Sequence, residues 1–233
     1  MILSFAGGFL VANSFNRNEL ESVRAENDRL RVNVAETSNK AAEFELSAEE
    51  IKTRIAEADG NPGNVKFNRD LAIALYRYGA IKKDVPILSE SVRLLGRIQT
   101  LDQKDIDVQV TLGHAHFDIA TFGKESARFK TARDIYTKVL ELRPRDADVI
   151  TDIALTYFLE EPPKLNSAAA EFQKALAINP KNERALQFYT QTLWQAGKND
   201  EATKVLDKLK EVNSSNSAIP ELETMLTQTP PAK

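Results

Sequence analysis

Residues 148–182, DVITDIALTYFLEEPPKLNSAAAEFQKALAINPKN, contain two helix-forming stretches separated by the break EEPP. In the second stretch Ala168, Phe172 and Ala175 are spaced four and then three residues apart, which places them on one face of a helix. Pro180 ends this stretch, because proline lacks the amide hydrogen that a helix interior needs. The segment therefore predicts a helical hairpin.

Four segments of the chain can be aligned on this hairpin pattern. In each first helix a large residue precedes a small one and an aromatic residue closes the set, over residues 71–76, 112–117, 153–158 and 189–194. Each second helix repeats the spacing of four and then three, in Ser91, Leu95 and Ile98; Ala132, Tyr136 and Val139; Ala168, Phe172 and Ala175; and Ala202, Leu206 and Leu209. A unit of this kind cannot bury its apolar face alone, so we expect the hairpins to stack on one another.

This pattern resembles the tetratricopeptide-repeat family, whose 34-residue unit has a large, small and tyrosine cluster, then an alanine, aromatic and alanine cluster, and a closing proline. The match is best over residues 148–182 and extends over about residues 65–216. Gln103 and Ser214 replace the closing proline, and we expect the turns within the first two repeats to hold about seven extra residues. The resemblance implies an all-α solenoid of helical hairpins with a concave inner surface.

The chain is divided on these grounds into six segments. They are an apolar N-terminal segment (1–16), a heptad helix or coiled-coil stalk (17–46), a leading helix (47–60), about four repeats (61–216), a capping helix (217–227) and a disordered tail (228–233). Ser47 and Glu50 have the spacing of a capping box, which predicts that a helix begins there. The capping helix, expected over residues 219–226, would shield the apolar face of the last repeat.

The first fifteen residues, MILSFAGGFLVANSF, contain no charged side chain. As a helix they would reach about 22 Å, which is short of the roughly 30 Å hydrocarbon core of a bilayer. We interpret them as the last part of a membrane anchor whose first residues are missing from this sequence. A cleaved signal peptide and a buried apolar helix are the alternatives.

Residues 17–46 have a heptad pattern. Its seam, at alternating spacings of three and four, consists of Leu20, Val23, Asn27, Leu30 and Val34. A buried Asn at such a position can pair with its twin across a parallel dimer and so specify register. The pattern predicts a parallel homodimer, and the alternative is a helix that packs its apolar stripe on its own repeats.

Composition excludes several classes of function. A net charge of -3 gives no basic field that would attract nucleic acid, and the absence of cysteine excludes disulfides and thiol chemistry. The only two histidines, His114 and His116, point about 200° apart on a helix and cannot share one metal ion. No phosphate-binding loop or nucleophile motif is present. We therefore expect no catalytic residue, no cofactor and no metal, and a protein that is not an enzyme.

A partner-binding groove is predicted along the first helices, which line the concave side in the family that this chain resembles. An aromatic residue recurs there in every repeat and would grip apolar side chains, while two basic residues would meet an acidic group. The predicted groove residues are Lys66, Arg69, Ile73, Tyr76, Val110, His114, Phe117, Thr151, Leu155, Phe158, Gln187, Gln191 and Trp194. The alternative is that the aromatic residues serve packing alone.

One subclass of such grooves, the clamp for a C-terminal carboxylate, is not expected. Repeat domains of that type place cations where this chain has Asp148 and Asp152, and two acids would repel a carboxylate.

These observations together predict a non-enzymatic scaffold that binds a protein or peptide partner, with an assembly or chaperone-like role in an envelope complex. Its plan resembles the anchored repeat subunits of cytochrome c maturation and protein translocation. A self-associating protein whose stalk forms the dimer is the alternative. The expected location is the bacterial inner membrane with a single span. The arginines that follow the apolar run favour a cytoplasmic repeat domain, whereas the architectural analogues favour the periplasm, towards which our prediction leans.

Overall fold

The computed structural model describes residues 47–230, which form ten helices and no strands. Residues 52–228 belong to one compact unit. The helices are α3 (Ala48–Gly60), α4 (Val65–Lys82), α5 (Val85–Leu101), α6 (Ile106–Phe122), α7 (Ala127–Leu142), α8 (Ala147–Leu159), α9 (Leu165–Ile178), α10 (Glu183–Gln195), α11 (Asn199–Val212) and α12 (Ile219–Leu226).

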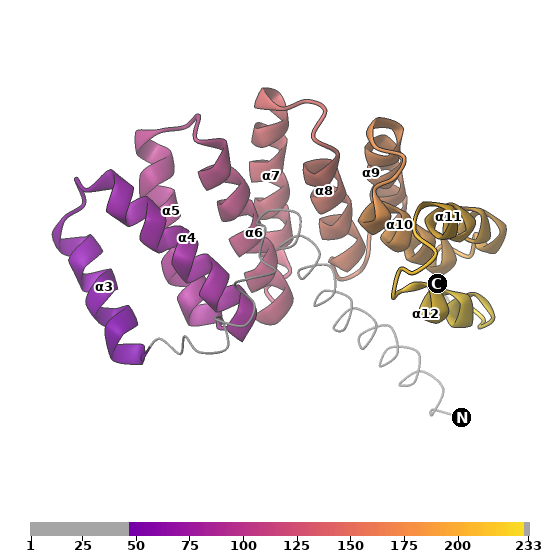
Figure 1. Ribbon diagram of the computed structural model, residues 1–233, viewed down its shortest axis with the longest axis horizontal. Coiled ribbons are helices and arrows are strands. Elements are labelled where there is room, and N and C mark those ends of the chain that lie inside the picture. Colours follow the sequence, from indigo (N-terminus) through magenta and orange to yellow (C-terminus); the bar gives the residue numbers. More distant parts are fainter. Residues whose placement is uncertain (1–46, 231–233) are drawn as a thin grey trace. The chain divides into compact units, whose positions relative to one another are not determined.

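The helices pack as a row of hairpins in chain order, from α4 with α5 to α10 with α11 (Figure 1). Each second helix also packs on the first helix of the next hairpin. Contacts also join the first helices of neighbouring hairpins, namely α4 with α6, α6 with α8, and α8 with α10. Among the described helices, no two second helices contact each other as closely. We call the side formed by α4, α6, α8 and α10 the inner face. The predicted all-α solenoid of helical hairpins is confirmed for the described residues.

Four-residue linkers join one hairpin to the next, and each ends in a side chain that caps the following helix. Asn64, Asp105, Asp146 and Asn182 each accept a hydrogen bond from the backbone N–H three residues on, at 3.0–3.3 Å. Such a cap satisfies one of the amide groups that a helix start leaves without a partner. The linker DQKD folds like NPGN, RPRD and NPKN because the final cap, rather than the proline, sets where the helix begins.

The prediction that the extra residues of the first two repeats lie in their turns is wrong. The turn between α4 and α5 has two residues, and the extra length lies in the helices instead. Helices α4–α7 have 16–18 residues, whereas α8–α11 have 13 or 14. Seven residues make roughly two helical turns, so one extra turn in each helix lengthens a hairpin without rotating its buried face.

The large-and-small pattern of the first helices serves close packing within each hairpin. Ala72, Ala154 and Thr190, the small residues of three repeats, are fully buried. At the fourth, Gly113, a Cβ atom would lie 2.8 Å from Cδ1 of Tyr136 and closer still to Cε1. The tyrosine ring therefore occupies the space that any other residue at position 113 would need.

Helix α3 begins with the predicted capping box. The Ser47 hydroxyl accepts from the Glu50 N–H at 3.2 Å, and the Glu50 carboxylate accepts from the Ser47 N–H at 2.9 Å. At the other end of α3, Asp59 forms ion pairs with Arg93 and Arg97 of α5, at 2.7 and 2.6 Å.

The predicted anchor (1–16) and stalk (17–46), including its seam, lie outside the described residues. None of the helices that the structure describes combines the length and the apolar character that a membrane span requires. In the last described residues, the carbonyl of Gln228 accepts a hydrogen bond from Trp194 Nε1 at 3.4 Å.

Candidate functional site: the inner face

The predicted groove residues come from α4, α6, α8 and α10, the four helices that form the inner face. Ile73 and Tyr76 are partly exposed. The residues of the later repeats are buried, with at most 9% of their surface exposed: Val110, His114, Phe117, Thr151, Leu155, Phe158, Gln187, Gln191 and Trp194.

Each of the four aromatic side chains contacts another part of the repeat domain, and Tyr76 of α4 stacks on His114 of α6. The ring of Phe117 meets Phe129 of α7 edge to face at 5.6 Å between centroids, and Phe158 meets Phe188 of α10 at 5.9 Å. Trp194 donates to the chain beyond α12. These contacts favour the packing alternative for the aromatic residues.

A polar chain crosses the inner face from α6 to α10. His114 Nε2 lies 3.0 Å from one carboxylate oxygen of Asp152, and Arg184 Nη2 lies 2.5 Å from the other. The ring of Tyr76, on α4, stacks on His114 at 6.1 Å. One residue from each first helix thus takes part, and Asp152, which is 2% exposed, is contacted by His114 on one side and by Arg184 on the other.

The basic residues at the start of the inner face already have partners in the chain. Arg69 Nε donates to Asp105 at 2.7 Å, and Lys66 pairs with Asp70 at 2.6 Å. Arg69 therefore ties α4 to the linker before α6, and its guanidinium is not available for an acidic ligand in the way that the sequence suggested.

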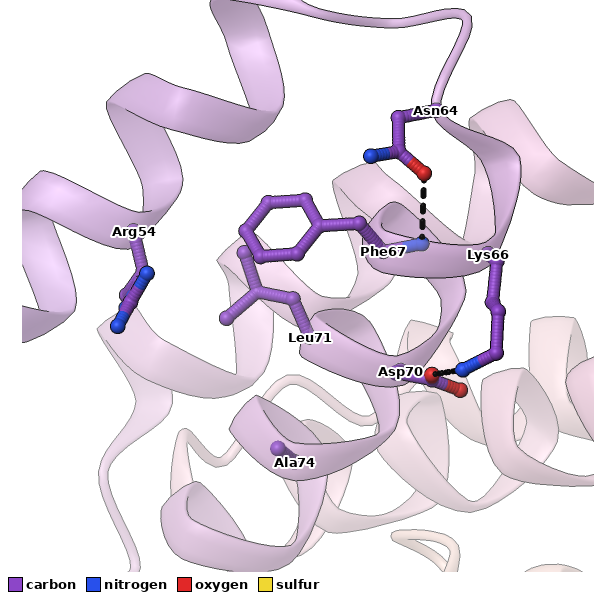
Figure 2. Close-up of a pocket in the computed structure, with 7 residues that line it drawn as sticks. All are labelled: Arg54, Asn64, Lys66, Phe67, Asp70, Leu71 and Ala74. Atoms are coloured by element: carbon purple, nitrogen blue, oxygen red, sulfur yellow. Dashed lines mark hydrogen bonds and ion pairs between the residues drawn. The ribbon is translucent and has the colours of Figure 1, made fainter.

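A pocket of about 490 Å³ lies beside these residues, between α3 and α4. It is lined by Arg54, Asn64, Lys66, Phe67, Asp70, Leu71 and Ala74. Figure 2 shows Phe67 and Leu71 on the side of α4 that faces Arg54, with the Lys66–Asp70 ion pair at the far side. The pocket is lined largely by apolar atoms of the first repeat, and its charged groups are paired.

Carboxylates collect at the middle of the inner face. Asp148 and Asp152 lie one turn apart on α8, and Asp118 lies one turn beyond His114 on α6. The pKa of Asp148 is raised, mainly because its surroundings displace part of its hydration and further because Asp152 and Asp146 are close. Asp148 itself is exposed and lies in the first turn of α8.

The two histidines have separate environments, as expected from their spacing. His114 faces Asp152, whereas the Nδ1 of His116 lies 3.2 Å from Arg128. Burial, with a smaller contribution from Arg128, lowers the pKa of His116 to about 4. His116 is therefore neutral at physiological pH, and it lies at the position that Tyr157 occupies in the next repeat.

The fold and its inner face place this chain in the class of helical-hairpin solenoids, and the comparisons agree. Residues 164–230 match the tetratricopeptide-repeat family model. The crystal structure of MamA has a TM-score of 0.58 at 21% identity, covering 72% of this chain and 89% of that one. MamA residues 41-end from Desulfovibrio magneticus RS-1 has a TM-score of 0.58 at 16% identity, with 72% and 86% covered.

TTC0263, a thermophilic tetratricopeptide-repeat protein of Thermus thermophilus, has a TM-score of 0.57 at 14% identity, with 77% of this chain and 90% of that chain covered. A search of curated proteins found no match. These structures share the fold with this chain, and the family match supports the resemblance seen in the sequence.

Sequence reasoning did not find the ion pair of Asp152 with Arg184 or the place of Tyr136 beside the inner face. Asp152 and Arg184 lie in consecutive repeats, on facing first helices. Opposite charges on the first helices of adjacent repeats are a signal that could have identified this pair. The position of the Tyr136 hydroxyl depends on helix packing and has no such signal.

Proposed function

We propose that this chain is a non-enzymatic scaffold that binds a segment of a partner polypeptide across the inner face of its repeats. The observation that carries the proposal is the contact of α4, α6, α8 and α10 along one side of the row. Helices from four hairpins thereby line one side of the row, an arrangement that suits an extended or helical ligand. The match to the tetratricopeptide-repeat model supports the same class of function.

The absence of cysteine allows a direct test of the surface. Thr111, on the same side of α6 as His114, and Thr137, exposed on α7, each donate a hydrogen bond to the carbonyl four residues before, at 2.7 and 2.8 Å. Thr111→Cys and Thr137→Cys are therefore matched variants. Each would be labelled with a bulky maleimide and offered peptides that were selected from a random library on the unmodified protein.

We expect the label at position 111 to abolish peptide binding and the label at position 137 to leave it unchanged. Equal binding by both labelled proteins would show that the inner face is not the binding surface. Failure to select any peptide would count against a peptide-binding scaffold altogether.

We further propose that the scaffold is tethered to a bacterial inner membrane through residues 1–16 and serves assembly of an envelope complex, with the repeats in the periplasm. The uncharged run at the N-terminus supports the tether. Fractionation of cells that express the full chain, followed by protease treatment of spheroplasts, tests both points. Recovery in the soluble fraction contradicts the tether, and protection from the protease contradicts the periplasmic location.

The second candidate function is self-association through residues 17–46, which the heptad seam supports. The mass in solution of the full chain would be compared with that of a chain lacking residues 1–46. A dimer that becomes a monomer while peptide binding persists assigns the two roles to separate parts of the chain. A full chain that is monomeric contradicts the dimer.

A further inference from the structure

The middle of the inner face has an excess of negative charge. Asp118, Asp148 and Asp152 lie on α6 and α8, where Arg184 forms an ion pair with Asp152, while Asp107 at the start of α6 pairs with Arg69. Arg184 is committed to Asp152, as is His114. Asp148 has no ion pair in the described part of the chain and receives one amide hydrogen bond, from Asn182 at 3.0 Å.

Partial desolvation and the neighbouring Asp152 and Asp146 raise the pKa of Asp148, whose side chain lies exposed in the first turn of α8. Groups that a fold holds in an unfavourable charge state are enriched at functional sites. An approaching cation would restore the favourable interaction that the chain itself does not provide.

A second observation, independent of the carboxylates, also indicates a missing ligand. The hydroxyl of Tyr136 is fully buried without a hydrogen-bond partner among the described residues, within electrostatic reach of Asp152 and Asp118. On α10, Nε2 of Gln187 is likewise buried without a partner, and this residue is 4% exposed. Buried polar atoms are nearly always hydrogen-bonded, so unsatisfied groups beside one surface suggest atoms that arrive with a ligand.

We propose that the partner segment is basic and that the α8 region of the inner face binds one of its lysine or arginine side chains, with Asp148 as the carboxylate that receives it. This inference rests on the proposed function, and it adds the charge of the partner. A polypeptide also supplies backbone carbonyl groups, which can accept from the Gln187 amide, and an ordered water can link it to the Tyr136 hydroxyl. A carboxylate-bearing segment is disfavoured at the same place.

Two fluorescein-labelled peptides of equal length, one alternating alanine with lysine and one alternating alanine with glutamate, test the charge. Their affinities for the full chain would be measured by fluorescence anisotropy. The variants are Asp148→Asn and, as the matched control, Asp134→Asn, which removes the same charge from an exposed position of α7. Asp148→Lys adds a reversal of charge at the same site.

We expect the lysine peptide to bind the native chain and to lose roughly 5- to 10-fold in affinity with Asp148→Asn, as for loss of one partly desolvated charge pair. Asp134→Asn should change the affinity by less than about twofold, as for a remote surface charge. Asp148→Lys should favour the glutamate peptide. Thermal unfolding of Asp148→Asn should occur no lower than in the native chain, which separates lost binding from lost folding.

Equal losses with Asp148→Asn and Asp134→Asn would overturn the assignment to α8. Binding of the glutamate peptide as tightly as the lysine peptide, or of neither peptide, would overturn a basic partner. The proposed function fails by a different result, because it requires only that the label at position 111 block whatever peptides are selected. Selected peptides that are blocked there but lack basic residues would leave the scaffold standing and refute this inference.

Discussion

Replacement of Gly113 by alanine tests the close approach of α6 and α7 at this residue. The new Cβ would lie 2.8 Å from Cδ1 and 3.0 Å from Cζ of Tyr136. Carbon atoms in contact normally lie about 3.5–4.0 Å apart, so the ring would have to move by roughly 1 Å. Tyr136 is fully buried and also packs against His114, at 5.8 Å between ring centroids.

Two effects of opposite sign contribute to the free energy of unfolding of this variant. Overpacking of a well-packed core costs about 1–3 kcal/mol, whereas alanine gains roughly 1 kcal/mol over glycine in a helix interior. Gly96→Ala provides the matched control, because Gly96 lies within α5 and a Cβ there meets no atom within 4 Å. The difference between the two variants cancels the helix propensity and leaves the overpacking cost of about 1–3 kcal/mol.

Urea unfolding of both full-length variants, followed by circular dichroism at 222 nm, provides the measurement. We expect Gly96→Ala to be more stable than the native chain and Gly113→Ala to be less stable than Gly96→Ala by the overpacking cost. Combining Gly113→Ala with Tyr136→Leu should recover part of the loss, because the smaller side chain leaves room for the new methyl group. Equal stability of the two alanine variants would refute the close approach at Gly113.

Three further predictions concern single side chains. The pKa of His116 falls from 6.5 to about 4 on folding, so the neutral side chain contributes about 2 kcal/mol to the free energy of unfolding after allowance for partial exposure. This contribution is complete above pH 6.5 and is lost as the pH falls through 4. His116→Phe should therefore flatten the dependence of stability on pH in that window, and an unchanged dependence contradicts this. Asp146→Ala should lower the free energy of unfolding in urea by about 1 kcal/mol, because the hydrogen bond that caps α8 is lost. An unchanged free energy would mean that this cap does not stabilise the fold. Tyr136→Phe should raise the melting temperature of the ligand-free chain, since it removes a buried hydroxyl without a partner among the described residues, and a lower melting temperature would indicate a hydrogen bond in solution.

The helical class of this protein followed from local chemistry. The four-and-three spacing in Ala132, Tyr136 and Val139 defines a face, and an Asn or Asp at the end of each linker defines a helix start. Both signals lie within a few residues of one another, so the sequence alone was sufficient to predict hairpins and their order. The same local signals mark Ser47 as the start of α3.

These local signals could not predict where the extra residues of the first two repeats lie. A longer turn and a longer pair of helices have the same length in sequence, and the Gly and Pro positions do not distinguish them. Helices α4–α7 are longer because an added turn in each keeps buried residues such as Leu75 and Leu95 in the core, while it extends the hydrogen-bonded backbone.

The candidate site was likewise predicted in part from the sequence. The family resemblance indicated the inner face, and it placed the two acids Asp148 and Asp152 where they would repel a carboxylate. The sequence did not show that Arg69 would be bound by Asp105, or that Asp152 would be shared by His114 and Arg184. Each of these pairs joins residues in different repeats.

The sequence by itself determined that this chain folds into stacked helical hairpins and which side of each second helix is buried, because periodicity and capping act between neighbours in the chain. Only the tertiary structure decided which inner-face charges neutralise one another and which one, on Asp148, is left without an ion pair in the described residues. The reason is physical: the pairing of charges depends on distances of a few ångströms between helices, and those distances are set by packing that no single repeat contains.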